Sequence, residues 1–188
     1  MGSLNSEQFI SEIENFDLFG KATLMEPFEW SVGDAKGVVM KAVNEYWTSG
    51  QRQANSLHEI SYRACFKPQL PEFFINRLTD EGDGVYDPFM GRGTTPLEAF
   101  LLGRKPIAND INPLSKILLL PRLNPPTLKL IQDRLDNIDL SLAKEENDDL
   151  LHFYHKDTLR EIISLKEYFL DREKDGTIDN IDGWIRIC

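Results

Sequence analysis

Apolar residues recur at helical spacing in two parts of the first fifty residues. The first run predicts a helix over residues 6–16, and the second predicts a helix over residues 35–47 that ends at Gly50. The stretch between them, through Pro27 and Trp30, is predicted to be irregular. We therefore expect residues 1–50 to form a helical N-terminal cap.

The middle of the chain alternates between short apolar runs and turn residues. Residues 69–78 predict a partly buried helix, and the run Glu-Gly-Asp-Gly after it predicts a turn. The next predicted elements are a strand at 85–87, a glycine turn at 91–93, a helix at 96–102 and a strand at 106–110. This order is half of a doubly wound α/β unit, so we predict an α/β domain over residues 51–188 that is incomplete at its carboxyl end.

The last third of the chain predicts further helices. Asn112 and Thr127 are suited to cap helices, another amphipathic helix is expected over 157–170, and residues 144–149 predict a charged loop. Residues 184–188 are expected to form a strand. Apolar side chains at helical spacing after Thr127 are expected in the core, namely Leu128, Ile131, Leu135, Ile138 and Leu142.

Composition fits one ordinary globular chain with an acidic balance. The 188 residues carry a net charge of −10, but residues 51–135 are net +2 while the flanks are net −5 and −7. An anionic ligand is therefore least repelled in the middle third, and tight DNA binding by this chain alone is not expected. With no apolar span, no signal sequence and no cysteine cluster, the chain is expected to be cytoplasmic, without membrane contact, disulfide or metal site.

The glycine turn carries the clearest chemical signal. Gly91 and Gly93 allow positive φ and close backbone approach where a strand leads into a helix, and residues 95–98 read as a capping box with Pro96 at the first helical position. Asp110 follows Gly91 by 19 residues, a spacing that places its carboxylate to accept hydrogen bonds from ribose hydroxyls. Pro96 disfavours a nicotinamide or flavin, and a P-loop lysine is missing. An adenosine-like ligand is indicated.

These residues resemble the amino-directed DNA methyltransferases, which use S-adenosylmethionine to methylate N4 of cytosine or N6 of adenine. Residues 87–95 match the family's Asp-Pro-Phe-x-Gly-Ser-Gly-Thr-Thr except that Arg92 replaces the serine. Residues 102–104 and 110–114 are also typical of the family. Upstream, His58 and residues 62–71 are similar to the segment that closes over the cofactor's methionine end. The resemblance covers residues 58–121.

The resemblance implies a Rossmann-like methyltransferase fold and a cofactor site. Asp87 would hold the cofactor's amino group, Asp110 the ribose, Phe89 and Gly91 the pocket wall, and Ile111 the adenine. Residues 66–68 would close the methionine side. The residues implied to bind the cofactor are Phe66, Pro68, Asp87, Pro88, Phe89, Gly91, Gly93, Thr94, Asp110 and Ile111.

The catalytic motif of the family is missing from these residues, so the catalytic residues are unknown. The family uses Asp/Asn/Ser-Pro-Pro-aromatic, which positions a flipped base amine, whereas this chain has Asn124-Pro125-Pro126-Thr127 and no aromatic there. We interpret that run as a helix start and expect the chain to be truncated before its catalytic part and inactive alone. Duplex DNA would bind through the missing parts, as in a restriction-modification system. The alternatives are an RNA or small-molecule methyltransferase, or a non-catalytic cofactor-binding subunit.

Other polar residues near these motifs have ordinary interpretations. We favour surface positions over phosphate contacts for Arg92, Arg104 and Lys105. His58 is expected to be a hydrogen-bonded structural histidine, and Cys65 a buried, inert thiol.

Overall fold

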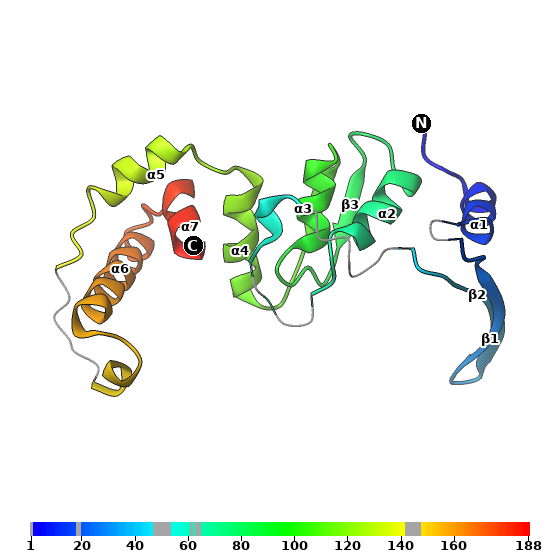
Figure 1. The fold of residues 1–188 in the computed structure, drawn as a ribbon, viewed down its shortest axis with the longest axis horizontal. Coiled ribbons are helices and arrows are strands. Elements are labelled where there is room, and N and C mark those ends of the chain that lie inside the picture. Colours follow the sequence, from blue (N-terminus) through cyan, green and yellow to red (C-terminus); the bar gives the residue numbers. More distant parts are fainter. Residues whose placement is uncertain (1, 18–19, 47–53, 61, 63–64, 142–147) are drawn as a thin grey trace. The chain divides into compact units, whose positions relative to one another are not determined.

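The computed structural model describes residues 2–17, 20–46, 54–60, 62, 65–141 and 148–188 (Figure 1). The chain divides into two compact units of mixed α/β and helical structure, Met1–Ile111 and Asn112–Cys188. This division does not coincide with the boundary predicted after residue 50, which itself lies outside the described residues. Among the described residues, every helix is too short or too polar to cross a membrane.

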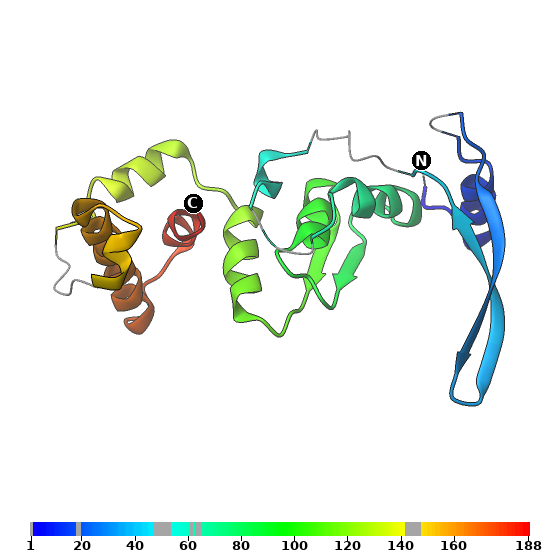
Figure 2. The same cartoon turned by 60° about the horizontal axis from the view of Figure 1, so that its bottom comes forward.

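The N-terminal region is one helix followed by a β-hairpin. Helix α1 (Ser6–Glu14) forms as predicted, because Asn5 accepts a hydrogen bond from the Gln8 amide in a capping box. Strands β1 (Leu24–Val32) and β2 (Ala35–Val43) pair antiparallel over their whole length, as a twisted ribbon (Figure 2). The predicted irregular stretch and the predicted helix over 35–47 are therefore wrong, and the region is not an all-helical cap.

The reason for this error is that pairing with a distant segment decides the conformation. Residues 35–43 are rich in valine, which suits a paired strand, and Gly33 adopts φ +58° in the two-residue turn that joins the strands. Residues 47–50, where the predicted helix would have ended, lie outside the described part of the chain.

Helix α1 is fastened to helix α2 (Gln69–Leu78), which has the predicted bounds. The Arg77 guanidinium donates to Glu12 at 2.6 Å and lies 3.8 Å from the Phe73 ring centroid. Aromatic contacts between Phe9 and Phe74 and between Phe16 and Phe73 extend the interface. These contacts hold the start of the chain on the α/β core of the first unit.

The α/β core contains the predicted strand, glycine turn, helix and strand. Strand β3 (Gly84–Asp87) pairs parallel with β4 (Lys105–Ala108), and α3 (Thr94–Leu101) packs against both strands and against α2. Leu97 and Ala99 of α3 are fully buried. The register brings the carboxyl end of β3 beside that of β4, the edge at which open α/β sheets bind ligands.

The start of α3 differs from the prediction. Gly93, at φ +86°, is the N-cap, so Pro96 is the third helical residue and residues 95–98 form no capping box. Proline is tolerated there because amides of the first helical turn have no intrahelical acceptor. Glu98 is consequently free of the capping role and is buried.

The second unit is helical. Its helices are α4 (Pro113–Leu123), α5 (Leu128–Leu135), α6 (Lys156–Lys174) and α7 (Asn180–Ile187), with a short 3-10 helix η2 (Asp148–His152). Asn112 and Thr127 cap α4 and α5 as predicted. The predicted core stripe after Thr127 is only partly present: Ile138, beyond the end of α5, is buried, whereas Leu128 and Leu135 within α5 are 79% and 40% exposed. Leu142 and most of the predicted charged loop lie outside the described residues.

The predicted strand over 184–188 is wrong, because α7 is built on a capping box in which Asp179 and Asp182 serve each other's backbone amides. Asp182 is fully buried and accepts hydrogen bonds from Arg134, from Tyr168 at 2.9 Å and from Arg172 at 2.6 Å. This group of four side chains ties α7 to α5 and α6.

Candidate functional site

The glycine turn lies at the carboxyl ends of β3 and β4. Gly91 adopts φ +53° and Gly93 φ +86°, conformations that favour glycine. The Met90 amide donates to the Asn109 carbonyl at 3.1 Å, and the Gly93 amide donates to the Met90 carbonyl at 2.7 Å. The turn is therefore closed on itself and fixed to the end of β4.

The structure brings both strand-end acids to this turn. Asp87 ends β3, and its Oδ1 accepts from the Phe89 amide at 3.0 Å. Asp110 faces the turn, because its Oδ2 accepts from the Gly91 amide at 2.8 Å. Such charge-assisted bonds fix the orientation of a carboxylate. Gly91 and Asp110, which are 19 residues apart in the sequence, are thus in direct contact.

The other predicted residues around the turn fall into two groups. Phe89 and Ile111 are 86% and 101% exposed, so two apolar side chains stand open beside the acids, and Pro88 is exposed with them. Gly93 and Thr94 are buried at the start of α3. Thr94 contacts the protein itself, since its Oγ1 accepts from Arg92 Nε at 3.1 Å.

Arg92 is buried, so the preference for a surface position is wrong. Its exposed fraction is 8%, and its Nη1 donates to the Ile60 carbonyl at 2.5 Å. Arg104 is also engaged within the protein, with Thr79 and the Leu102 carbonyl as acceptors. Lys105 is exposed, as predicted.

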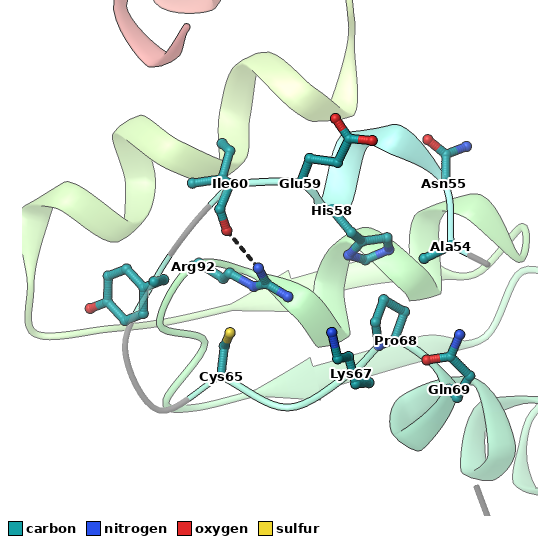
Figure 3. A pocket seen from close by; sticks show the side chains of 11 residues that line it. Ala54, Asn55, His58, Glu59, Ile60, Cys65, Lys67, Pro68, Gln69 and Arg92 are labelled. Atoms are coloured by element: carbon teal, nitrogen blue, oxygen red, sulfur yellow. Dashed lines mark hydrogen bonds between the residues drawn. The ribbon is translucent and has the colours of Figure 1, made fainter. Parts of the chain in front are cut away.

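A cavity of about 390 Å³ lies beside the turn, and Figure 3 shows the side chains around it. Of the predicted cofactor residues, Pro68 lines the cavity, and Phe66, two residues earlier in the sequence, is exposed. Asp87 and Asp110 do not line the cavity and lie at the strand ends. Several of the lining residues were not predicted as site residues from the sequence, Arg92 among them. The sequence signal that could have identified Arg92 is that it replaces the serine of the family signature. The lining residues are Ala54, Asn55, His58, Glu59, Ile60, Tyr62, Cys65, Lys67, Pro68, Gln69 and Arg92.

His58, like Arg92, is a buried polar residue that lines this cavity. Its Nε2 lies 2.8 Å from Glu98 Oε2, which confirms the structural histidine. Its Nδ1 is buried and has no hydrogen-bond partner among the described residues. Burial raises the pKa of the nearby Glu72 carboxyl, and the charge of Glu98 raises it further. A polar ligand group reaching Nδ1 would relieve the cost of an unpaired buried nitrogen.

Cys65 is exposed at this cavity, so the prediction of a buried thiol is wrong. The segment that contains it lines the cavity instead of packing into the core. Within the described residues, no group of three or more His, Cys, Asp or Glu side chains is arranged to hold a metal ion.

The Pro-Pro run belongs to the second unit and joins two helices. Asn124 follows α4 and its carbonyl accepts from Asn180 Nδ2 at 2.5 Å, while Thr127 Oγ1 accepts from the Leu130 amide at 3.4 Å. This geometry agrees with the interpretation as a helix start.

The side chains around the turn fit a nucleoside that carries an amino-acid group. Two carboxylates suit hydroxyl and amino groups, exposed Phe89 and Ile111 suit a base ring, and the adjoining polar cavity with its unpaired His58 nitrogen suits a polar chain. These are the parts of S-adenosylmethionine.

Comparison with known proteins gives a family match over the same region. A family model described as DNA methylase, for N6- and N4-methyltransferases, matches residues 23–116, which is half of the chain. The match begins just before the hairpin and includes α2, the glycine turn and both parallel strands.

Several Type II methyltransferases are similar to the chain. M.MjaII of Methanocaldococcus jannaschii is 37% identical over 71 residues, which are 37% of this chain and 13% of that protein. M.BsoBI of Geobacillus stearothermophilus is 30% identical over 130 residues, 56% of this chain and 26% of that protein. M.BglI of Bacillus subtilis is 29% identical over 150 residues, 76% of this chain and 38% of that protein.

The chain thus spans between 13% and 38% of the length of these three relatives. No solved structure matches it. The family match covers the glycine turn and both strand-end acids, in the order and spacing that the structure brings together. The chain therefore belongs to the DNA methylase family of amino-directed methyltransferases.

Proposed function

We propose that this chain binds S-adenosylmethionine for methyl transfer to an exocyclic amine of cytosine or adenine in DNA, on a Rossmann-like arrangement of β3, α3 and β4. The observation that carries the proposal is the Asp110 carboxylate, which faces the glycine turn and is oriented by the Gly91 amide. An acid in this position at the end of the second strand suits ribose hydroxyls.

Each part of the site has a role in holding the cofactor. Asp110 would accept hydrogen bonds from the ribose, and Asp87 would hold the amino group. Phe89 and Ile111, both exposed, would cover the adenine. Phe66, Pro68 and the cavity beside them would enclose the methionine end. The bound cofactor would supply the methyl group and a sulfonium leaving group, while the protein would supply orientation and exclusion of water.

DNA is favoured over RNA or a small molecule because the family model that matches residues 23–116 is described as DNA methylase. The 188 residues contain no Asp/Asn/Ser-Pro-Pro-aromatic run. We therefore propose that the chain binds the cofactor but does not transfer the methyl group by itself.

Calorimetry with S-adenosylhomocysteine tests the binding site. We expect the wild-type chain to bind and the Asp110→Asn variant to bind at least about tenfold more weakly, because a hydrogen bond to a charged group contributes about 1.5–3 kcal/mol. Asparagine keeps an acceptor for the Gly91 amide, so the turn itself is retained. Asp34→Asn, in the exposed hairpin turn, is the matched control and should bind as the wild type does. Equal affinity of Asp110→Asn and the wild type would refute the assigned role of Asp110.

A methyl-transfer assay on duplex DNA tests the second part of the proposal. We expect no transfer above background by a chain that binds S-adenosylhomocysteine. Transfer by the 188-residue chain would show that a residue set other than the family's tetrapeptide performs catalysis here.

A further inference from the structure

Two buried polar contacts hold residues 54–60 against the glycine turn and α3. The first joins Arg92 to the Ile60 carbonyl at 2.5 Å, and the second joins His58 to Glu98 at 2.8 Å. Arg92 and His58 are 8% and 5% exposed. Figure 3 shows the Arg92 guanidinium reaching across to Ile60 at the cavity. Residues 54, 55 and 58–60 form one wall of that cavity.

The contact to Ile60 depends on the residue by which this chain departs from the family signature. A serine side chain ends one atom beyond Cβ and is too short to replace a guanidinium that spans the gap between two segments. The arginine is further fixed, because its Nε donates to Thr94 Oγ1 at 3.1 Å. A buried guanidinium held at two of its nitrogens has little freedom to rotate away.

We propose that Arg92 is a positioning residue of the cofactor site, which holds residues 54–60 in place as the wall facing the cofactor's amino-acid end. This inference rests on the proposed function, because it concerns the same site. A wall that is already ordered lowers the entropic cost of binding, whereas a loosened wall must be ordered by the ligand. Arg92 therefore raises the affinity for the cofactor without touching the strand-end acids.

A matched control separates positioning from general stabilisation. Arg104 lies in the same unit and donates to the carbonyls of Thr79 and Leu102, as Arg92 does to Ile60, but it does not line the cavity. The variants Arg92→Ser and Arg104→Ser each remove a guanidinium that is bonded to main-chain oxygens. Both are expected to lower the thermal midpoint of the chain.

The two serine variants should differ in ligand affinity. In calorimetry with S-adenosylhomocysteine, we expect Arg92→Ser to bind about tenfold more weakly than the wild type and Arg104→Ser to stay within about twofold. Arg92→Lys keeps a cation and one donor, so it should recover part of the loss. The His58 amide donates to the Asn55 carbonyl and the Glu59 amide to the Ser56 carbonyl. In hydrogen exchange without ligand, these two amides should exchange faster in Arg92→Ser alone.

Affinity of Arg92→Ser within twofold of the wild type would overturn the inference, as would equal losses in the two serine variants. Failure of the wild type to bind would refute the proposed function and the ligand part of this inference with it. Hydrogen exchange would then decide the remaining part: unchanged exchange of His58 and Glu59 in Arg92→Ser would show that Arg92 does not hold this wall.

Discussion

Replacing Asp182 by asparagine should strongly destabilise the second unit. The Asp182 carboxylate is fully buried and accepts from Arg134, Tyr168 and Arg172. Asparagine preserves the size of the side chain but removes the charge and turns one acceptor into a donor. After the substitution, the guanidinium groups of Arg134 and Arg172 keep Asp179 as a carboxylate partner.

The size of the effect follows from these contacts. Removing one partner of a buried ion pair costs about 3–5 kcal/mol, because the remaining charge is left buried. Asp179 continues to compensate part of the charge, and the arginines are 22% and 28% exposed, so we expect the lower end of this range, about 3 kcal/mol. For a unit of this size, such a loss lowers the thermal midpoint by about 15 °C.

Thermal and urea denaturation followed by circular dichroism would measure this loss. Asp171→Asn is the matched control, because Asp171 is exposed on α6, and its effect should lie within about 0.5 kcal/mol of zero. A loss below about 1 kcal/mol for Asp182→Asn would mean that the buried cluster does not hold α7 to α5 and α6.

Three further outcomes are expected. Burial raises the pKa of Asp179, but hydrogen bonds from Arg134 and from backbone amides outweigh this effect and lower the pKa to about 2, below the ordinary 3.8. The contribution of Asp179 to stability is therefore present above pH 3.8 and is lost as the pH falls toward 2. Because the side chain is 43% exposed and its charge is screened by solvent, Asp179→Asn should remove about 1 kcal/mol of stability at pH 7 and should flatten the acidic part of the curve of stability against pH. Gly93→Ala should lose about 1–2 kcal/mol in urea denaturation, because alanine is strained at φ +86°, and no change in midpoint would contradict the capping role. Thr127→Ala should lose about 1 kcal/mol of stability and leave the affinity for S-adenosylhomocysteine unchanged, whereas weaker binding would count against a purely structural Pro-Pro run.

The sequence predicted those elements whose signals are local. Helices α1, α4 and α5 begin at side-chain caps, and the glycine turn is marked by two residues that adopt positive φ. Parallel strands on either side of α3 follow from that turn, because a strand–helix–strand unit has few ways to pack. The same reasoning predicts that Asp110 lies beside Gly91, and the hydrogen bond between the Gly91 amide and the Asp110 carboxylate confirms this proximity.

Elements that depend on distant partners were missed. The β1–β2 hairpin needs two segments to pair, and a valine-rich run is read as a helix when its partner is not recognised. Helix α7 is fixed by Asp182, whose arginine partner Arg134 lies 48 residues earlier in the chain. The burial of Arg92 likewise depends on the Ile60 carbonyl, 32 residues away. No local pattern contains these contacts.

The exposed position of Cys65 at the cavity provides a chemical reporter that requires neither DNA nor catalysis. A ligand that fills the cavity would shield this sulfur from alkylation by iodoacetamide, whereas Cys188, exposed in the other unit, would react at an unchanged rate and serve as an internal standard. Peptide mass spectrometry of the two alkylated cysteines would therefore measure the occupancy of the cavity by ligand within one sample. The same exposure means that a reducing agent is needed during storage, to keep the chains from cross-linking.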